Sequence, residues 1–559
     1  MRRDRRHNEK DKKVPKVKKQ PVTQADFYED GTFAEEQAER WLLSDVRKCL
    51  RFYVDAFQLY QTGLTVGTEA TERSAYDISY NEARLLLQIH TDYMANDGSI
   101  NLLQFVKLDD IPGIESILRP LPEIVGEMET VRQKFLGSSD IDMWDLEYNI
   151  LTSYLSLVES NDTYTLYGAN LLMVIDKFVE LSQYLVRKQI DELEKWDLAA
   201  GAGAPDESDN LVRDMLDEQA AASSGNLNGD GSGVVTNAAN ASDNDRSEMM
   251  NVSDQITKES LTELLLDCYK FAQVLLEIIV QRKSGANESN DNTESLNVVQ
   301  LNYLADTADK VYNTTDDIIR TVSSTIPLDL SDITLAKFGI EGARILLQGD
   351  LPSLDTWIAT EIPSDIPPTD QIAYNMVKVD ALDFTLGNMP ASSDTSVEWA
   401  LSSALAKRCN EVGGQLSAIR NDILVNGKFD QEKAKQQSHT VFQLCSIYVT
   451  SADNDLRRFV IKQREGEGAS KTAEILFKNA KTILKNIQTI SSKSCGMQET
   501  IVEKLKRNYI YQQAAARLEL IDVAESSRKL NAEDHKLPMF NDAAIQDLLS
   551  DHPFYSQLR

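Results

Sequence analysis

Cysteine and histidine are scarce in this sequence. It contains five cysteines, none of them in a paired spacing, and five histidines spread along the whole chain. A small disulfide-stapled fold needs a dense cysteine framework, and a structural zinc site needs cysteines or histidines at short ligand spacing. We therefore expect neither a disulfide scaffold nor a metal site.

Long hydrophobic runs are also missing. The most hydrophobic stretch, Leu261 to Val280, is interrupted by the charged residues Glu263, Asp267, Lys270 and Glu277. A bilayer-spanning helix needs about 20 nearly uncharged residues, so we expect a buried helix of a soluble fold and no membrane contact. The N-terminus is basic and no apolar signal segment follows it, so we expect the protein in the nucleus, the cytoplasm or both.

The sequence lacks the motifs of common catalytic folds. It contains no G-x-x-x-x-G-K-[ST], no G-x-G-x-x-G that opens a helix and no G-x-S-x-G. His90 could be a buried base, although a histidine in a leucine-rich helix is more often a core or interface residue, and His439 and His535 look exposed. Cys495 is the more exposed cysteine, whereas four others lie on apolar helix faces: Cys49, Cys268, Cys409 and Cys445. We expect no catalytic residue, no cofactor and no enzyme activity.

Proline is infrequent, and its 14 residues cluster in connections, which leaves room for long helices. Between Ala473 and Ile490 the apolar residues recur mostly at three- and four-residue steps, which indicates one apolar face on a helix. The stretch from Leu261 to Leu275 has a similar pattern. Alternating strand patterns with hairpin turns are almost absent. The sequence therefore predicts an all-α fold.

Residues 1–24 are predicted to form a disordered basic tail, because such a run of charge cannot bury itself. Its two basic clusters resemble a bipartite nuclear localisation signal. The alternative is a solvated tail that no receptor reads, or one that folds back on the acidic body. The candidate signal residues are Arg2, Arg3, Arg5, Arg6, Lys12, Lys13, Lys16, Lys18 and Lys19.

Two polar segments divide the rest of the chain. Residues 197–255 combine low hydrophobicity with charge of one sign, which predicts a disordered acidic linker. A shorter polar loop is expected near residues 284–294. The linker separates a first helical block, residues 25–196, from a second, residues 256–530, and a C-terminal tail follows at residues 531–559.

A helical chain of 559 residues exceeds what one core supports, which favours stacked helical hairpins. The run KCLRFYVDAFQLY places a small residue, an aromatic residue and an alanine as in the second helix of a tetratricopeptide repeat, and two later segments echo the first helix. The N-terminal third therefore resembles a tetratricopeptide-repeat protein, although the first-helix glycine and the turn prolines are missing. The resemblance implies an α-solenoid of antiparallel helical hairpins; irregular helix pairs are the alternative. The matching packing residues are Cys49, Tyr53, Ala56, Tyr80, Ala83, Trp144 and Tyr148.

The sequence has fewer basic than acidic residues. It contains 58 Lys and Arg residues and 88 Asp and Glu residues, which gives a net charge of −30. Buried unpaired carboxylates are costly, so most of this excess must lie at the surface. A concave acidic face would attract Lys- and Arg-rich polypeptides, as the resemblance to acidic tetratricopeptide chaperones and adaptors also implies. Charge that serves only solubility is the alternative. The candidate client-binding groove comprises Glu35, Glu36, Glu39, Asp109, Asp110, Asp140, Asp142 and Asp145.

These patterns favour a non-catalytic scaffold, adaptor or chaperone that captures a basic client protein, such as a ribosomal protein, a histone or import cargo. One alternative is a structural subunit of a large intracellular complex. A second is an RNA-associated factor, because the C-terminal helices are locally basic from Arg457 to Arg507. The acidity of the body opposes nucleic-acid binding outside those helices and the basic tail.

Overall fold

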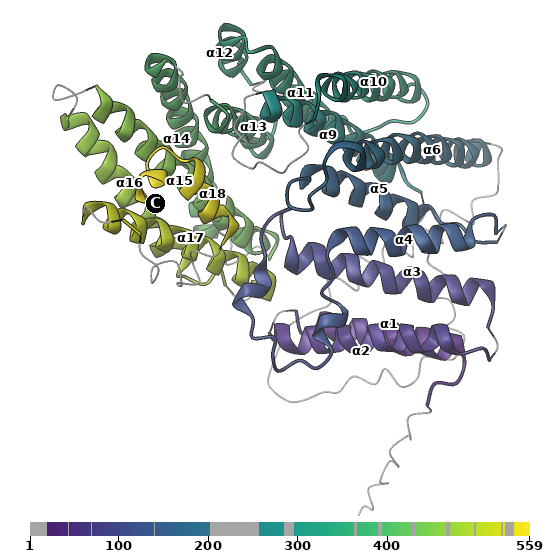
Figure 1. The fold of residues 1–559 in the computed structure, drawn as a ribbon. Helices are drawn as coiled ribbons and strands as arrows, with labels where there is room; N and C mark the ends of the chain where they lie inside the picture. Colours follow the sequence, from purple (N-terminus) through teal and green to yellow (C-terminus); the bar gives the residue numbers. More distant parts are fainter. Residues whose placement is uncertain are drawn as a thin grey trace, which may run out of the picture. The chain divides into compact units, whose positions relative to one another are not determined.

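The computed structural model consists of helices joined by turns (Figure 1). Among the residues that it describes there is no β-strand, and a single bridge joins Asn96 to Ile100. The all-α fold predicted from the sequence is therefore confirmed. The described residues are 20–42, 44–68, 70–138, 140–201, 256–283, 296–362, 366–389, 394–426, 431–465, 470–496, 499–526, 529–530 and 542–559.

The chain divides into two compact units, and the first comprises Met1–Met94 and Val106–Asp142. Within it α1 packs on α2 and α3, α2 packs on α3, and α3 packs on α4. The boundary at residue 142 falls inside the range 25–196 that the sequence assigns to one block. The described helices of this unit are α1 (Gln24–Arg40), α2 (Val46–Thr65), α3 (Glu72–Ile89), the π-helix η1 (His90–Met94), the 3₁₀-helix η3 (Ile114–Ser116) and α4 (Leu121–Phe135).

Local sequence explains where these helices begin and how closely they pack. At the start of α1, the Thr23 hydroxyl accepts a hydrogen bond from the Asp26 amide, and the Asp26 carboxylate accepts one from the Thr23 amide. This capping box satisfies two amides that a helix start would otherwise leave unpaired. Gly31 lets α1 approach α2, because a methyl group there would overlap the ring of Tyr60, which is fully buried.

The second unit comprises Ala95–Phe105 and Met143–Arg559. It contains most of the helices that the structure describes. They are η2 (Leu102–Phe105), α5 (Trp144–Glu159), α6 (Gly168–Gly201), α9 (Lys258–Lys283), α10 (Val298–Val322), α11 (Ser331–Gln348), α12 (Leu351–Ala359), α13 (Pro368–Gly387), α14 (Thr395–Asn426), α15 (Gln431–Arg464), α16 (Ser470–Ser491), α17 (Ile501–Glu525), α18 (Ala543–Asp551) and η8 (Tyr555–Leu558).

Helices of the second unit pack mainly on neighbours in the sequence. Helices α5, α6 and α9 contact one another, and the stacked rings of Phe178 and Phe271, 3.7 Å apart, join α6 to α9. Helix α9 also contacts α10 and α11, and α11 contacts α12 and α13. From α13 onward each helix packs on the next as far as α17. Packing between successive helices joins the helices of this unit, whereas the predicted solenoid of antiparallel hairpins is not confirmed.

The C-terminal segment contributes to the core, although the sequence suggests a tail from residue 531. Helix α18 and η8 pack with α15, α16 and α17 in one hydrophobic cluster. Ile545, Leu549 and Tyr555 are completely buried there. The apolar residues of α18 recur at a four-residue step, which places them on one helix face that the rest of the unit covers.

The tetratricopeptide resemblance is not confirmed. Cys49, Tyr53, Ala56, Ala83 and Trp144 are buried as packing residues should be, and Tyr80 and Tyr148 are half-buried. In a tetratricopeptide array, α3 and α5 would be the first helices of two repeats that lie two repeat lengths apart. Three other helices would then lie between them. The described chain has α4 there, with only short helical turns besides it.

Several predictions concern residues outside the described part of the chain. These are the candidate nuclear localisation signal, the polar loop near residues 284–294, and the acidic linker apart from its first residues. Helix α6 continues to Gly201, a few residues past the predicted start of that linker.

Candidate functional site

One residue of the predicted acidic groove lies inside the protein. Glu35 is only 7% exposed and accepts a hydrogen bond from the Tyr60 hydroxyl at 2.5 Å. Its other carboxylate oxygen forms an ion pair with Arg84 of α3. Glu35 therefore ties α1 to α2 and α3, and its prediction as a client-binding residue is wrong. A paired carboxylate is tolerated in a core because its partners replace water.

The other seven predicted residues lie on separate segments. Glu36 and Glu39 are exposed on α1, and Asp109 and Asp110 are exposed ahead of η3, where Asp110 pairs with Lys107 at 3.3 Å. Asp140 and Asp142 follow α4, whereas Asp145 lies in α5 of the other unit. The pockets at Tyr312, at Tyr184 and at Phe52 are lined by other residues.

A different group of carboxylates gathers on the second unit. We call it the acidic strip and define it as Glu159 of α5, Asp267 and Glu277 of α9, and Asp380 and Asp383 of α13. Its members are close enough to influence one another electrostatically. Glu277 and Asp267 raise the pKa of Glu159, and Asp383 and Glu277 raise that of Asp380, each in addition to the larger effect of burial.

Most carboxylates of the acidic strip are at least partly exposed to water, although nearby protein atoms reduce their hydration. The side chains of Glu159, Asp380 and Asp383 are exposed and Glu277 is half-buried, whereas Asp267 is buried. Loss of hydration nevertheless raises the pKa of Asp380 to about 6, and it raises the pKa of Glu277 and Asp383 as well.

Cations are placed at the two ends of the acidic strip. Lys270 lies 3.4 Å from the Asp267 carboxylate, and Arg457 lowers the pKa of Asp383 against the stronger effect of burial. In the middle, Glu277 and Asp380 have no ion pair within the described residues, and Glu277 accepts only an amide hydrogen bond from Gln273 at 2.8 Å. Uncompensated negative charge is therefore greatest at Glu277 and Asp380.

The thiols are unsuited to nucleophilic chemistry. Burial raises the pKa of Cys49 to about 11 and that of Cys268, Cys409 and Cys445 to about 12. These four cysteines are buried, as the sequence predicts. Cys495 is also buried, at 5% exposure, so its predicted greater exposure is wrong. A reactive cysteine needs a lowered pKa and solvent access, and these five have neither.

The histidines show no catalytic arrangement in the described residues. His90 is buried, its Nδ1 atom lies 3.3 Å from the Arg119 carbonyl oxygen, and burial lowers its pKa. His439 is exposed, as expected, and His535 lies outside the described residues. No cluster of three potential metal ligands occurs in the described part of the chain.

Much of the basic charge of the C-terminal helices is already paired within the protein. Helix α16 retains exposed lysines on one face at seven-residue spacing, namely Lys471, Lys478 and Lys485. The paired residues include Arg458 with Asp455, Lys462 with Glu465, Lys481 with Glu525, Lys506 with Asp97, Arg507 with Glu499 and Arg517 with Asp453. These pairs reduce the positive charge available to a phosphate backbone.

A pocket of about 580 Å³ opens between α10, α11 and α13. Three aromatic rings line it, those of Tyr312, Phe338 and Tyr374, together with the backbone segment that follows α12. We call it the aromatic pocket. Phe338 stacks on Trp357 at 4.6 Å between ring centroids and contacts Tyr374 at 5.2 Å, so its ring is held in place from two sides.

Two cations fix the segment at the end of α12. Lys378, which is 1% exposed, donates a hydrogen bond to the Thr360 carbonyl at 2.7 Å, and Arg408 donates one to the Ile358 carbonyl at 2.7 Å. Cations are favourable at a helix C-terminus, where carbonyl groups lack intrahelical partners. Loss of hydration, with the nearby Arg408 charge, lowers the pKa of Lys378 to about 8.

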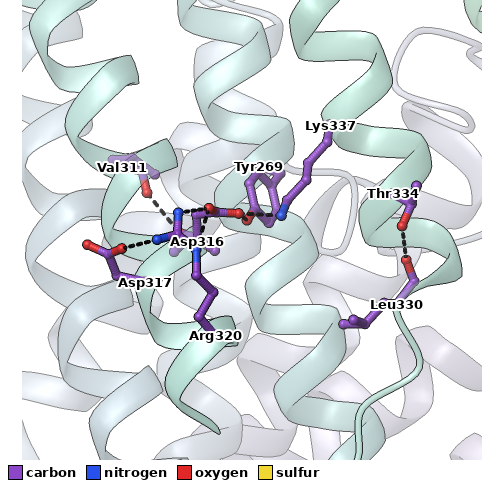
Figure 2. A network of polar contacts seen from close by, with 9 residues as sticks. Tyr269, Val311, Asp316, Asp317, Arg320, Leu330, Thr334 and Lys337 are labelled. Atoms are coloured by element: carbon purple, nitrogen blue, oxygen red, sulfur yellow. Dashed lines mark hydrogen bonds and ion pairs between the residues drawn. The ribbon is translucent and has the colours of Figure 1, made fainter. Parts of the chain in front are cut away.

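The basic residues of the aromatic pocket are held by aspartates of α10. Figure 2 shows Lys337 and Arg320 turned toward the same carboxylate, that of Asp316, with the hydroxyl of Tyr269 beside it. Arg344 reaches Asp309 at 2.7 Å and lies 4.3 Å over the ring of Tyr312. The Lys337 and Arg320 hydrogen bonds lower the pKa of Asp316, which keeps this network ionised.

Together these features describe an all-helical protein with an acidic surface and an aromatic pocket. No described helix is long and apolar enough to cross a membrane. No solved structure matches the chain.

The chain belongs to the YNL193W family. It is 40% identical to "Uncharacterized protein YNL193W" of Saccharomyces cerevisiae (strain ATCC 204508 / S288c) over 570 aligned positions, which cover 99% of each chain. Two family models also match, the YNL193W-like protein middle domain at residues 162–348 and the YNL193W C-terminal domain at residues 368–559. The interval between them contains α12.

Proposed function

We propose that the protein is a non-catalytic binding scaffold whose acidic strip captures a basic segment of a client polypeptide. The single observation that supports this proposal most is that Glu277 of α9 and Asp380 of α13, two carboxylates with no ion pair within the described residues, lie close enough for Glu277 to raise the pKa of Asp380. Like charges held together in a partly desolvated place repel one another, and a bound cation would relieve that repulsion. Lysine and arginine side chains supply such cations.

Neutralising the centre of the acidic strip should weaken the binding of a basic peptide. We expect the variant Glu277→Gln/Asp380→Asn/Asp383→Asn to bind a nona-lysine peptide about tenfold more weakly at low salt, because it loses three attractive charges near the ligand. Fluorescence anisotropy of a labelled peptide measures the Kd. For the wild-type protein, raising the ionic strength from about 0.05 to 0.5 M should also weaken binding strongly.

The matched control removes the same charge elsewhere. Glu36→Gln/Glu39→Gln/Asp109→Asn neutralises three exposed acids of the groove predicted from the sequence, and we expect it to change the Kd by about twofold or less. An equal loss in both variants would attribute binding to net charge alone. A larger loss in the control would place the client on the first unit, and binding that salt leaves unchanged would contradict the proposal.

Binding should also depend on pH through Asp380. Its pKa of about 6 means that it is mainly protonated at pH 5 and mainly ionised at pH 7, whereas the lysines of the peptide stay charged throughout. We expect the affinity of the wild-type protein to fall by about threefold to tenfold from pH 7 to pH 5. The variant Asp380→Asn should show a flatter profile, and an unchanged profile in that variant would assign the titration to another group.

A further inference from the structure

The aromatic pocket carries a charge that its own basic residues do not compensate. On α11, Glu341 lies four residues after Lys337 and three before Arg344, so either cation could pair with it along the helix. Instead Lys337 bonds to Asp316 and Arg344 bonds to Asp309, both on α10 (Figure 2 shows the first pair). Glu341 is exposed at the pocket and has no ion pair within the described residues.

A second carboxylate stands at the same pocket. Glu361 belongs to the segment after α12 and is exposed, and it too has no ion pair within the described residues. The pocket therefore offers a ligand two open carboxylates beside the aromatic surface of Phe338 and Tyr374, while the cations Lys337 and Arg344 are engaged by aspartates. A matching ligand combines positive charge with a flat or apolar surface.

We propose that the aromatic pocket receives an arginine side chain of the client polypeptide. This inference rests on the proposed function, because it specifies which residue of a basic segment the protein recognises. A guanidinium group is planar, stacks on aromatic rings and can donate two parallel hydrogen bonds to a carboxylate. The aromatic pocket has aromatic rings and carboxylates around one volume of about 580 Å³.

Arginine fits these surroundings better than lysine does. The protein itself stacks a guanidinium here, since Arg344 lies 4.3 Å over the ring of Tyr312. A lysine ammonium is more strongly hydrated and has no flat face, so it would lose more hydration on entering a pocket lined by rings. Phe338 contacts Trp357 and Tyr374, which fixes the orientation of the rings that line the pocket.

The test compares two peptides on the full-length protein. We expect the wild-type protein to bind nona-arginine about tenfold more tightly than nona-lysine at equal ionic strength. The variant Glu341→Gln/Glu361→Gln should bind the two peptides about equally. The strip variant Glu277→Gln/Asp380→Asn/Asp383→Asn should bind both more weakly and keep the preference for arginine. Tyr374→Leu removes a ring without a charge change and should also reduce the preference.

The outcomes separate the two proposals. If neither peptide binds the wild-type protein, the proposed function fails and this inference fails with it. If both bind equally, or if the preference for arginine persists in both pocket variants, only the inference is overturned. The control Glu36→Gln/Glu39→Gln removes two exposed charges far along the chain from the pocket and should leave the ratio of the two Kd values unchanged. Far-UV circular dichroism confirms that each variant keeps its helices.

Discussion

Replacing Asp453 with alanine is expected to destabilise the C-terminal helices by about 3–5 kcal/mol. Asp453 of α15 accepts hydrogen bonds from Nε of Arg517 at 2.9 and 3.0 Å and from the Tyr555 hydroxyl at 2.9 Å. Arg517 is 5% exposed and Tyr555 is fully buried. The substitution would leave a guanidinium in the core without its counter-charge, which is one of the most destabilising changes that a single residue can produce.

The reactivity of two buried thiols measures this effect. Cys445 and Cys495 belong to the same hydrophobic cluster as Tyr555, so they react with a thiol reagent only when that cluster opens. We expect Asp453→Ala to increase the labelling rate by about two to four orders of magnitude, since about 1.4 kcal/mol corresponds to a tenfold change in the open population.

An exposed ion pair provides the control for Asp453. Asp522 pairs with Lys481 at 3.0 Å but its side chain is 59% exposed, so Asp522→Ala should cost less than about 1 kcal/mol. Similar labelling rates in the two variants would show that the Asp453 carboxylate does not support this core.

Acidification should destabilise the same region through His552. Its Nδ1 atom accepts a hydrogen bond from the Phe554 amide at 3.2 Å, which leaves Nε2 to donate to the Asp453 carbonyl at 3.0 Å. Both ring nitrogens of the neutral imidazole are thus satisfied. Burial, with the charges of Arg457 and Arg517, lowers the pKa of His552 to about 4 against the opposing effect of Asp453.

His552 has a lower pKa in the folded chain than in the unfolded chain. An unfolded histidine has a pKa of about 6.5, so between pH 6.5 and pH 4 the unfolded chain binds a proton at this position and the folded chain does not. The contribution of His552 to stability is therefore complete above pH 6.5 and decreases as the pH falls. The total loss amounts to about 3 kcal/mol near pH 4.

A non-titrating variant isolates the contribution of His552. Urea unfolding of the wild-type protein and of His552→Gln, followed by circular dichroism between pH 7 and pH 4.5, should give free energies of unfolding that converge as the pH falls. Carboxyls with a raised pKa, such as Asp380, bind protons in both proteins and cancel in the difference. Parallel pH profiles would contradict the assignment.

The sequence predicts those features that depend on local periodicity. The spacing of apolar residues identifies the helices, and the position of Cys49 on an apolar face identifies it as a core residue. The burial of Glu35 is not predictable, because nothing near it in the sequence reveals that Arg84 and Tyr60 contact it from two other helices. The sequence does not reveal that the C-terminal segment joins the core, because most of the residues that cover Ile545 and Tyr555 belong to helices earlier in the chain.

The sequence contains part of the information needed to predict the acidic strip, in the spacing of charged residues along helices and not in their local density. Asp267 and Glu277 interrupt the most hydrophobic stretch of the sequence, and with Glu263 and Lys270 they recur at helical spacing, so they share one polar face of α9. Asp380 and Asp383 likewise lie one turn apart on α13. Tertiary packing brings the carboxylates of α9 and α13 together, and dense acidic runs such as those at Asp109 and Asp140 do not reveal it.

The segment Ala95–Phe105 has a consequence for synthesis on the ribosome. It lies early in the chain but packs with the second unit, where Leu102 is buried and Asp97 bonds to Lys506, 409 residues later. At about 5–20 residues per second, its partner helix emerges roughly 20–80 s after it does. During that interval the apolar residues of this segment lack the helix that covers them in the folded protein.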